Sequence, residues 1–326
     1  MKSENLLRLE DQGDNSGCWV LPIEGEDDKI IVRSNGAATY VAKDIPYAAW
    51  KLGALTDPFN YAEYTTQPNG KILYKTTLEE TQIQKQSFAA NKVITVIDNR
   101  QTNLQKIVTN LMSKFNPESS YVHLGYEAVT LSSETAKILG NTTDGKDVQM
   151  SGRKGLYINA DEIITKLEKH IFLESKERND DLDDASLSEI AHNVAVGTIR
   201  YELIKPDLGK IITFDINTSL RLEGDTCSYI QYSCVRAGRI LEKFGKEPNF
   251  DIQFDQLNTE YEINLIKQIG LFEVFVNDAA KNYSPKVIAK YCYDLSVVFS
   301  SFYEHVNVLK ADTPELINAR LCLILS

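Results

Sequence analysis

The sequence of 326 residues lacks the features of a membrane-bound, disulfide-bonded or zinc-binding protein. It has no run of about eighteen apolar residues, so we expect no membrane-spanning helix. Its polar, acidic N-terminus has neither the basic start nor the apolar stretch of a secretory signal. The five cysteines are scattered and form no CxxC pair. They argue against a disulfide framework and for a reducing, cytoplasmic environment.

Histidine and positive charge are also in short supply. None of the four histidines has a partner at the spacing of metal ligands, so no metal site is predicted. The formal net charge is −11, which excludes a protein that binds polyanions over its whole surface. Any contact with a nucleic acid would have to come from a local basic surface.

Strand and helix signals alternate in residues 1–130, as in an α/β domain. A β-branched run at 29–34, the turn signal Asn35-Gly36 and a second run at 38–42 predict a hairpin. Asp44 is then a candidate N-cap for a short helix through residues 48–50.

Two further strands are predicted at residues 70–74 and 93–97. The second is apolar enough to be buried on both faces of a parallel sheet. Apolar residues at helical spacing over 104–111 predict a helix directly after it.

The second half of the chain changes character. Residues 145–155 form a loop rich in glycine and basic residues, Asn159 precedes a helix, and the charged run 174–186 predicts a linker or exposed helix end. Beyond it the sequence predicts helices, each opened by a capping signal. These signals are Ser186 with Glu189, Thr259 with Glu262, Ser284-Pro285 and Thr313-Pro314.

Several segments resemble a known family. Residues 148–155, VQMSGRKG, resemble the KMSKS signature loop of class I aminoacyl-tRNA synthetases. Residues 97–106 resemble the VIDxRQxxxQK segment of the arginine enzymes, and residues 33–45 resemble their RSDGTxTYxxxDI segment. Three further blocks resemble the entry into their anticodon-binding domain: 214–215, 224–226 and 229–237. The blocks follow the family order, so the chain is similar to the C-terminal portion of arginyl-tRNA synthetases.

The resemblance implies an α/β plus all-α protein. Residues 1–166 would be the back half of a Rossmann-like catalytic domain, residues 167–215 a helical connector, and residues 216–326 a helical-bundle anticodon-binding domain. The family's HIGH motif is not found. The segment beginning at His123 resembles it faintly but stands too close to the signature loop, so we expect an ordinary structural histidine there. We therefore expect a chain that lacks the first half and the last helix of the enzyme and is inactive alone.

The implied activity is arginine–tRNA ligation. The carboxylate of arginine attacks the α-phosphate of ATP and releases pyrophosphate, and the arginyl group then moves to the terminal ribose of tRNA(Arg). The implied ligands are arginine, ATP with Mg²⁺ and tRNA(Arg), and the missing N-terminal half is a candidate partner. A synthetase-derived tRNA-binding or regulatory protein without catalysis stays open as the alternative.

The signature loop implies the catalytic and nucleotide-binding residues. Arg153 and Lys154 would offset charge near the pyrophosphate, and Ser151 would orient the loop. Met150, Gly152 and Gly155 would lie against ATP, the glycines because they let the backbone approach a phosphate closely. Gln149 replaces the first lysine of KMSKS, which leaves the basic role to Arg153, Lys154 or a residue outside this chain. The alternative is a solvated basic turn.

The resemblance also implies an arginine site. Asp44 would accept the two parallel N–H groups of the guanidinium, with Tyr40 beside the substrate and Gln101 adding a polar contact. The alternatives are an N-cap for Asp44, an ordinary strand aromatic for Tyr40 and a helix-start side chain for Gln101.

A face at helical spacing predicts the tRNA contact. Arg236 and Arg239 suit phosphate groups, and Tyr229 can stack on an unpaired base. Tyr232 lies on the same face. The alternative is that the tyrosines belong to the core of the bundle and the arginines are solvated.

Overall fold

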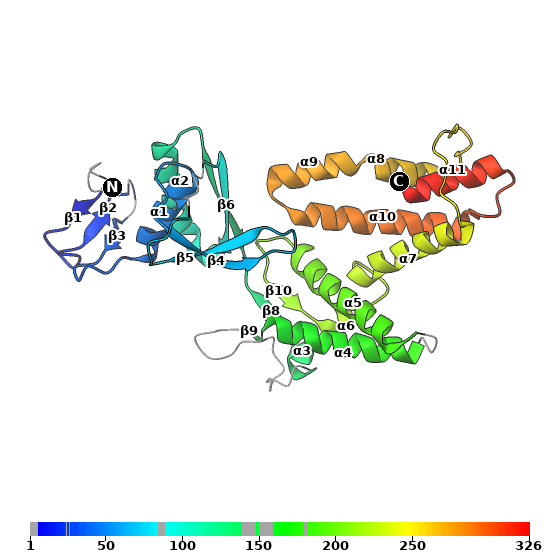
Figure 1. Ribbon diagram of the computed structural model, residues 1–326, viewed down its shortest axis with the longest axis horizontal. Coiled ribbons are helices and arrows are strands. Elements are labelled where there is room, and N and C mark those ends of the chain that lie inside the picture. The colour runs from blue at the N-terminus through cyan, green and yellow to red at the C-terminus, as the bar shows by residue number, and fades with distance from the viewer. Residues whose placement is uncertain are drawn as a thin grey trace. The chain divides into compact units, whose positions relative to one another are not determined.

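The computed structural model describes residues 6–23, 25, 27–83, 89–138, 148–149, 159–178 and 182–326. The chain divides into two compact units, Met1–Tyr126 and Glu127–Ser326. Figure 1 shows the strands of the first unit in blue and cyan and the long helices of the second from green to red.

The first unit contains three small groups of strands and two helices. Strands β1 (Arg8–Leu9), β2 (Trp19–Leu21) and β3 (Lys29–Val32) form an antiparallel sheet, and β4 (Asn60–Thr66) pairs with β5 (Ile72–Thr77) as a hairpin. Helix α1 (Tyr40–Lys51) lies between these groups in the sequence. A β–α–β unit closes the region, with β6 (Lys92–Asp98), the short helix η1 (Asn99–Gln101), α2 (Thr102–Phe115) and β7 (Ser120–Tyr126).

The hairpin predicted for residues 29–42 is wrong in its second half. A turn forms at this signal, but one residue earlier than expected: the amide of Gly36 donates to the carbonyl of Arg33 at 2.9 Å, and Gly36 has a φ of +83°, whereas Asn35 is not at positive φ. A single bridge joins Val32 to Ala38, and the chain then enters α1 at Tyr40.

Burial explains why this segment is helical despite its local strand pattern. Val41, Ile45, Ala48 and Leu52 recur at 3- and 4-residue spacing and are nearly fully buried in the core of the unit. One helical face therefore buries apolar surface that a strand would leave half exposed. Thr39 takes the N-cap position, so the expected capping role of Asp44 is also wrong.

The strand and helix predicted over residues 93–111 are confirmed as β6 and α2. Strands β6 and β7 are parallel. The expectation of a strand buried on both faces is wrong, because Val93 packs in the core whereas Ile94 and Val96 are 43% and 63% exposed. The predicted strand at 70–74 is β5, shifted toward its C-terminal side.

The second unit opens with a small mixed sheet and continues as helices. Strand β8 (Val129–Leu131) pairs in parallel with β10 (Ile212–Phe214) and antiparallel with β9 (Val148–Gln149). Four helices follow or separate these strands along the chain: α3 (Ser133–Ile138), α4 (Ala160–Arg178), α5 (Asp184–Ile204) and α6 (Ile216–Ser219). The bundle that follows has α7 (Cys227–Phe244), α8 (Glu260–Gly270), α9 (Phe272–Asn282), α10 (Pro285–His305) and α11 (Pro314–Leu325).

Most predicted helix starts in this unit are confirmed. Thr259 and Glu262 form a reciprocal capping box, and Thr313 caps α11 ahead of Pro314. Ser284 takes the N-cap position of α10, although its side chain makes no capping bond. The start predicted at Ser186 is wrong: Asp183 is the N-cap of α5 and accepts from the amide of Ser186.

The expected boundaries at residues 166 and 215 do not coincide with a division in the packing. Residue 166 lies inside α4, and the second unit continues across residue 215. The charged run 174–186 contains the end of α4, which extends to Arg178, and the start of α5 at Asp184, so the expected exposed helix end is present. Residues 179–181 lie outside the described residues.

Candidate functional site

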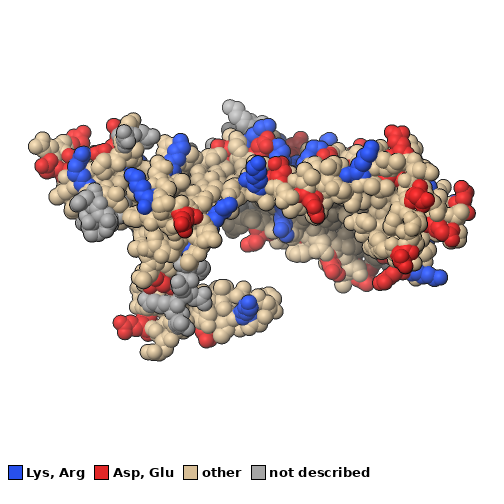
Figure 2. All heavy atoms as spheres, turned by 90° about the horizontal axis from the view of Figure 1, so that it is seen from above, with Lys and Arg blue, Asp and Glu red and all other residues tan. Residues whose placement is uncertain are grey.

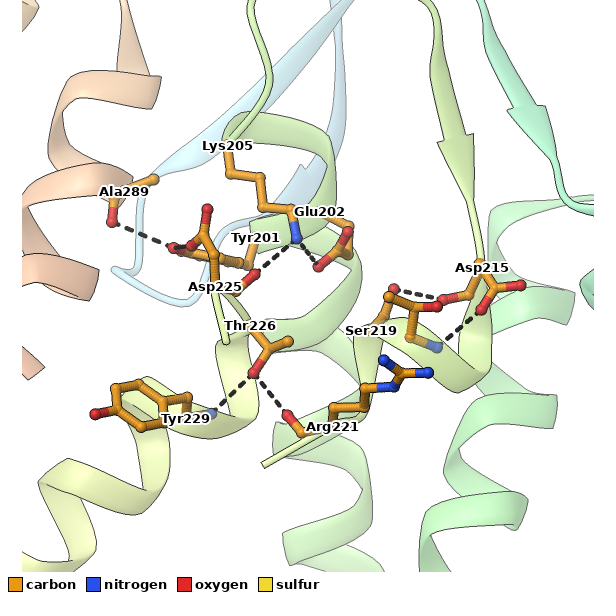
Figure 3. Close-up of polar contacts among 11 residues, drawn as sticks. Tyr201, Glu202, Lys205, Asp215, Ser219, Arg221, Asp225, Thr226, Tyr229 and Ala289 are labelled. Atoms are coloured by element: carbon orange, nitrogen blue, oxygen red, sulfur yellow. Dashed lines mark hydrogen bonds and ion pairs between the residues drawn. The ribbon is translucent and has the colours of Figure 1, made fainter. Parts of the chain in front are cut away.

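The start of α7 is built by the residues of the predicted entry motifs (Figure 3). The hydroxyl of Thr226 accepts from the amide of Tyr229 at 3.2 Å and donates to the carbonyl of Arg221 at 2.6 Å. One side chain thus caps the helix and ties it to the preceding turn. These residues position α7 through backbone contacts, so their role is structural.

A buried tyrosine holds the residue before the cap. The Tyr201 hydroxyl donates to the Asp225 carboxylate at 2.5 Å, and burial together with this bond raises the pKa of Tyr201. Lys205 Nζ donates to the carbonyl of Asp225 at 2.8 Å and to the Glu202 carboxylate at 2.6 Å. Figure 3 shows these groups converging between the end of α5 and the start of α7. The entry to α7 is therefore fixed from two sides.

Asp215 is the N-cap of α6 and accepts from the Thr218 amide at 2.8 Å and the Ser132 hydroxyl at 2.6 Å. Burial pushes the pKa of Asp215 upward, but these bonds hold it below its usual range. The Phe214-Asp215 block thus joins β10 to α6 and does no chemistry in the described contacts.

The predicted tRNA face of α7 presents an arginine between two aromatic rings. The Arg236 guanidinium lies 4.2 Å from the ring of Tyr232 and 4.8 Å from that of Tyr303, and it donates to the Tyr232 hydroxyl at 3.0 Å. Tyr232 and Tyr303 are 42% and 40% exposed. Arg239 is exposed one turn further along. We call Tyr232, Arg236 and Tyr303 the α7–α10 aromatic cluster.

The sequence left two roles open for the tyrosines of α7, packing in the bundle core or contact with tRNA, and the two side chains differ in burial. Tyr229 is half-buried and packs against Tyr293 of α10 at a ring separation of 5.8 Å. Tyr232 is exposed instead. Sequence reasoning missed Tyr303, because α10 lies far along the chain and no local signal connects the two helices.

Acidic side chains gather at the far end of the bundle. Figure 2 shows them at the right-hand end of this view, where α7 ends and α11 begins. Exposed acidic residues of this region are Glu242, Glu247, Asp251, Asp255, Asp312 and Glu315. A polyanion would be repelled there, which leaves the part of α7 that carries Arg236 and Arg239 as the better surface for phosphate groups.

The predicted arginine-site residues lie in the first unit. Tyr40 is 77% exposed at the first position of α1, so it is not a strand aromatic. Asp44 lies one turn later, and Gln101 ends η1. Asp44 lines a cavity of about 610 Å³ together with Trp50 and Phe59, whereas Tyr40 lines a separate cavity of about 320 Å³.

Asp44 is bonded to a residue that the sequence indicated only as part of the family motif at 97–106, with no role of its own. Gln105 of α2 is fully buried, and its Nε2 donates to Asp44 Oδ2 at 3.4 Å. Burial raises the pKa of Asp44, and the bond from Gln105 opposes this rise. The sequence signals that could have pointed to this pair are the second glutamine of the motif at 97–106 and its i, i+4 relation to Gln101.

The strand ends beside η1 are closely packed. A Cβ added to Gly125 would stand 1.9 Å from Asn99 Oδ1, so this position requires glycine unless Asn99 moves. His123 Nε2 makes a hydrogen bond of 3.0 Å with the carbonyl of Ile97 on β6. This bond joins the two strands, and the structural role expected from the sequence stays a prediction.

The signature-loop residues lie outside the described residues; they are Met150, Ser151, Gly152, Arg153, Lys154 and Gly155. The backbone of β9 leads into this loop and pairs with β8. Within the part of the chain that the structure describes, no helix is long and apolar enough to cross a membrane. The same residues contain no group of three or more potential metal ligands.

Comparison with known proteins finds a family match in the second half of the chain and relatives that match most of its length. The DALR anticodon binding domain family matches residues 230–326. The arginine–tRNA ligase of Deinococcus radiodurans is 30% identical over 96% of this chain and 52% of its own length. That of Thermus thermophilus is 33% identical over 84% of this chain and 43% of its own length. The chain therefore spans about half the length of the curated relatives it matches.

Solved structures of arginyl-tRNA synthetases are also similar to the chain. Thermus thermophilus arginyl-tRNA synthetase superposes with a TM-score of 0.81 at 29% identity, covering 98% of this chain and 52% of the other. The Plasmodium falciparum enzyme shares the fold at 20% identity, with a TM-score of 0.65. Over nearly its whole length, the chain is therefore similar to the C-terminal part of arginyl-tRNA synthetases.

Proposed function

We propose that this chain is the tRNA-binding and signature-loop portion of an arginine–tRNA ligase. The observation that carries the proposal is the similarity to arginine–tRNA ligases along 96% of the chain. The enzyme would join arginine to ATP with release of pyrophosphate and then pass the arginyl group to the terminal ribose of tRNA(Arg). Catalysis of this kind depends on positioning and on stabilising charge near the pyrophosphate.

The arginine site of the proposal centres on Asp44. Its carboxylate stands at the wall of a cavity that Trp50 and Phe59 also line. A carboxylate beside aromatic rings suits a planar cation, because it accepts paired N–H groups while the rings contact the flat face. Tyr40 and Gln101 would contact the rest of the amino acid from the starts of α1 and α2.

The ATP site of the proposal lies at the loop after β9. Arg153 and Lys154 would offset charge on the phosphates, Ser151 would orient the loop, and Met150 with the two flanking glycines would pack against the nucleotide. Mg²⁺ would accompany the ATP.

We also propose that the first unit is the back half of a Rossmann-like domain. The β6–α2–β7 unit is a parallel crossover, the building block of such sheets. A two-stranded parallel sheet is too small to be stable alone. Parallel sheets are normally covered on both faces, yet Ile94 and Val96 are open. The remainder of a full-length enzyme, supplied as a preceding segment or a separate N-terminal half, would cover this face.

The tRNA surface of the proposal is the α7–α10 aromatic cluster with Arg239. Arginine stacked on tyrosine keeps a fixed direction while its remaining N–H groups stay available to phosphate. An exposed tyrosine next to it can stack on an unpaired base of the anticodon loop.

The first test is aminoacylation by this chain with ATP, radiolabelled arginine and a mixed tRNA pool. Binding of the same tRNA, measured by filter retention over a salt series, accompanies it. Arg236→Ala should weaken binding and reduce the slope of log affinity against log salt by about 1. Arg200→Ala, an exposed arginine on α5, is the matched control and should leave both values unchanged.

A tRNA-binding protein without catalysis is the second candidate, favoured by Gln149 and Gly152, which stand in the signature loop in place of KMSKS residues. Binding without charging, restored to charging by a separately supplied N-terminal half of a relative, would support the ligase proposal. Binding that no such addition converts to charging would support the second candidate. Absence of tRNA binding in a folded chain would contradict both.

A further inference from the structure

A chain of polar side chains runs through the core of the first unit and ends at Asp44. Thr95 Oγ1 donates to the hydroxyl oxygen of Tyr121 at 2.8 Å, and the Tyr121 hydroxyl donates to Gln105 Oε1 at 3.0 Å. Gln105 Nε2 then donates to Asp44 at 3.4 Å. Gln105 and Tyr121 are 1% and 9% exposed. Four elements thus contribute one side chain each, from β6, β7, α2 and α1.

The direction of these bonds follows from the single hydrogen of each hydroxyl together with the charge of the Asp44 carboxylate. The Tyr121 hydroxyl has a single hydrogen, which it gives to Gln105 Oε1. The Gln105 amide must therefore turn its NH₂ group toward Asp44. The reversed amide would face Asp44 with an oxygen, an arrangement that only a protonated carboxyl could satisfy. Because Thr95 donates to the Tyr121 oxygen, that hydroxyl keeps its own hydrogen for Gln105.

We propose that Tyr121, acting through Gln105, is a positioning residue that holds Asp44 as an ionised acceptor for the guanidinium group of arginine. The inference rests on the proposed function, in which Asp44 reads the substrate. Thr95 sets the direction of the relay from its far end. None of the three supporting residues touches the substrate; their effect is to keep both the charge and the orientation of one carboxylate.

The surroundings of Asp44 explain why such support is needed. Burial alone favours the neutral acid and raises the pKa of Asp44. Lys43 and Tyr47 of its own helix line the same cavity, and the neutral Gln105 faces it from α2. Tyr121 of β7 keeps its proton, because burial first, and Asp44 as a lesser cause, raise the pKa of its hydroxyl. The relay therefore supplies an uncharged donor at a place where burial disfavours the carboxylate.

The test is an NMR titration of the Asp44 side-chain carboxyl in the chain with ¹³C-labelled aspartate. We expect the pKa of Asp44 to be higher in Tyr121→Phe and in Gln105→Met than in the unmodified chain. Tyr201→Phe is the matched control, since it removes a tyrosine–aspartate bond in the other unit, and it should leave Asp44 unchanged. If Tyr121→Phe does not fold, Thr95→Val, nearly equal in volume, should shift Asp44 in the same direction. An unchanged pKa of Asp44 in the folded variants would overturn the proposed role of Tyr121 and Gln105.

Arginine binding, measured by calorimetry on the same variants, separates the relay from the function on which it rests. Gln105→Met removes a hydrogen bond to a charged group, which predicts affinity about tenfold weaker. Tyr121→Phe removes the neutral bond that orients Gln105 and should weaken arginine binding in the same direction. A raised pKa of Asp44 together with weakened arginine binding supports the inference in full. If the pKa of Asp44 rises but no protein binds arginine, including the unmodified chain, arginine is overturned as the ligand. The role of Tyr121 and Gln105 in supporting Asp44 would then still hold. Unchanged arginine affinity in folded variants overturns the positioning role.

Discussion

A buried ion pair in the helical bundle gives a sharp test of how that unit is held together. Glu262 of α8 is fully buried, and one of its oxygens accepts from the Thr259 amide, the Thr259 hydroxyl and the Asn258 amide at 2.7–3.1 Å. The other accepts from Arg320 Nε of α11 at 2.7 Å. Every group around this carboxylate is a donor.

Glu262→Gln keeps the shape of the side chain and removes its charge. Whichever way the new amide turns, its NH₂ group meets a donor, either the backbone amides or Arg320. Breaking a buried charge pair costs about 3–5 kcal/mol, and we expect a loss of that size in the free energy of unfolding. Arg320→Met should cost less, because Glu262 keeps the donors of its capping box.

The pH dependence has a definite sign. Burial pushes the pKa of Glu262 upward, but the bonds from Thr259 and Arg320 prevail and hold it below its usual range. A pKa lower in the folded than in the unfolded state stabilises the fold above the unfolded pKa of about 4.3. This stabilisation is lost as the pH falls through the folded pKa. The difference in the free energy of unfolding between the unmodified chain and Glu262→Gln should therefore become smaller at acid pH.

Urea unfolding followed by far-UV circular dichroism at neutral pH and near pH 4 measures both effects. Glu260→Gln is the matched control, since Glu260 lies in the same first turn and is exposed. It should change the unfolding free energy by less than about 0.5 kcal/mol. Two results would refute the reasoning. One is that Glu262→Gln loses no more unfolding free energy than the control. The other is that the difference in unfolding free energy between Glu262→Gln and the unmodified chain does not decrease as the pH falls.

Three further outcomes are expected. Thr226→Ala removes the cap of α7 and should lower the unfolding free energy by about 1 kcal/mol; a thermal midpoint equal to that of the unmodified chain would contradict the capping role. Gly125→Ala places a methyl group 1.9 Å from Asn99 Oδ1 and should cost about 1–3 kcal/mol; unchanged urea unfolding would mean that Asn99 moves away freely. Asp44→Asn should abolish arginine binding in calorimetry while the chain stays folded, and full affinity in this variant would remove Asp44 from the proposed site.

Local signals were most successful where a few adjacent residues settle the outcome. The capping box at Thr259 and Glu262 formed as predicted, because its bonds join residues only three positions apart. A turn also formed next to Asn35, because Gly36 takes the positive φ that the turn requires, although the turn closes between Arg33 and Gly36. Helix α2 followed its apolar periodicity.

Errors arose where packing outweighed local preference. The segment from Tyr40 has the β-branched and aromatic residues of a strand, yet it is helical because its apolar face closes the core of the first unit. The start of α5 was misplaced because Asp183 competes with Ser186 as a cap, and two capping residues three positions apart look alike in the sequence. Strand β6 looked fully buried, but burial depends on what covers the sheet.

The amino-acid sequence was sufficient to identify the family, the helical character of the second half and most of its helix starts. Those features depend on ordered motifs and on hydrogen bonds within one turn. It could not show that Tyr303 would meet Arg236, or that Thr95, Tyr121 and Gln105 would converge on Asp44. Such meetings join residues far apart in the chain. They arise only when helices and strands bury their apolar faces together, because that packing is what brings distant polar groups within hydrogen-bonding distance.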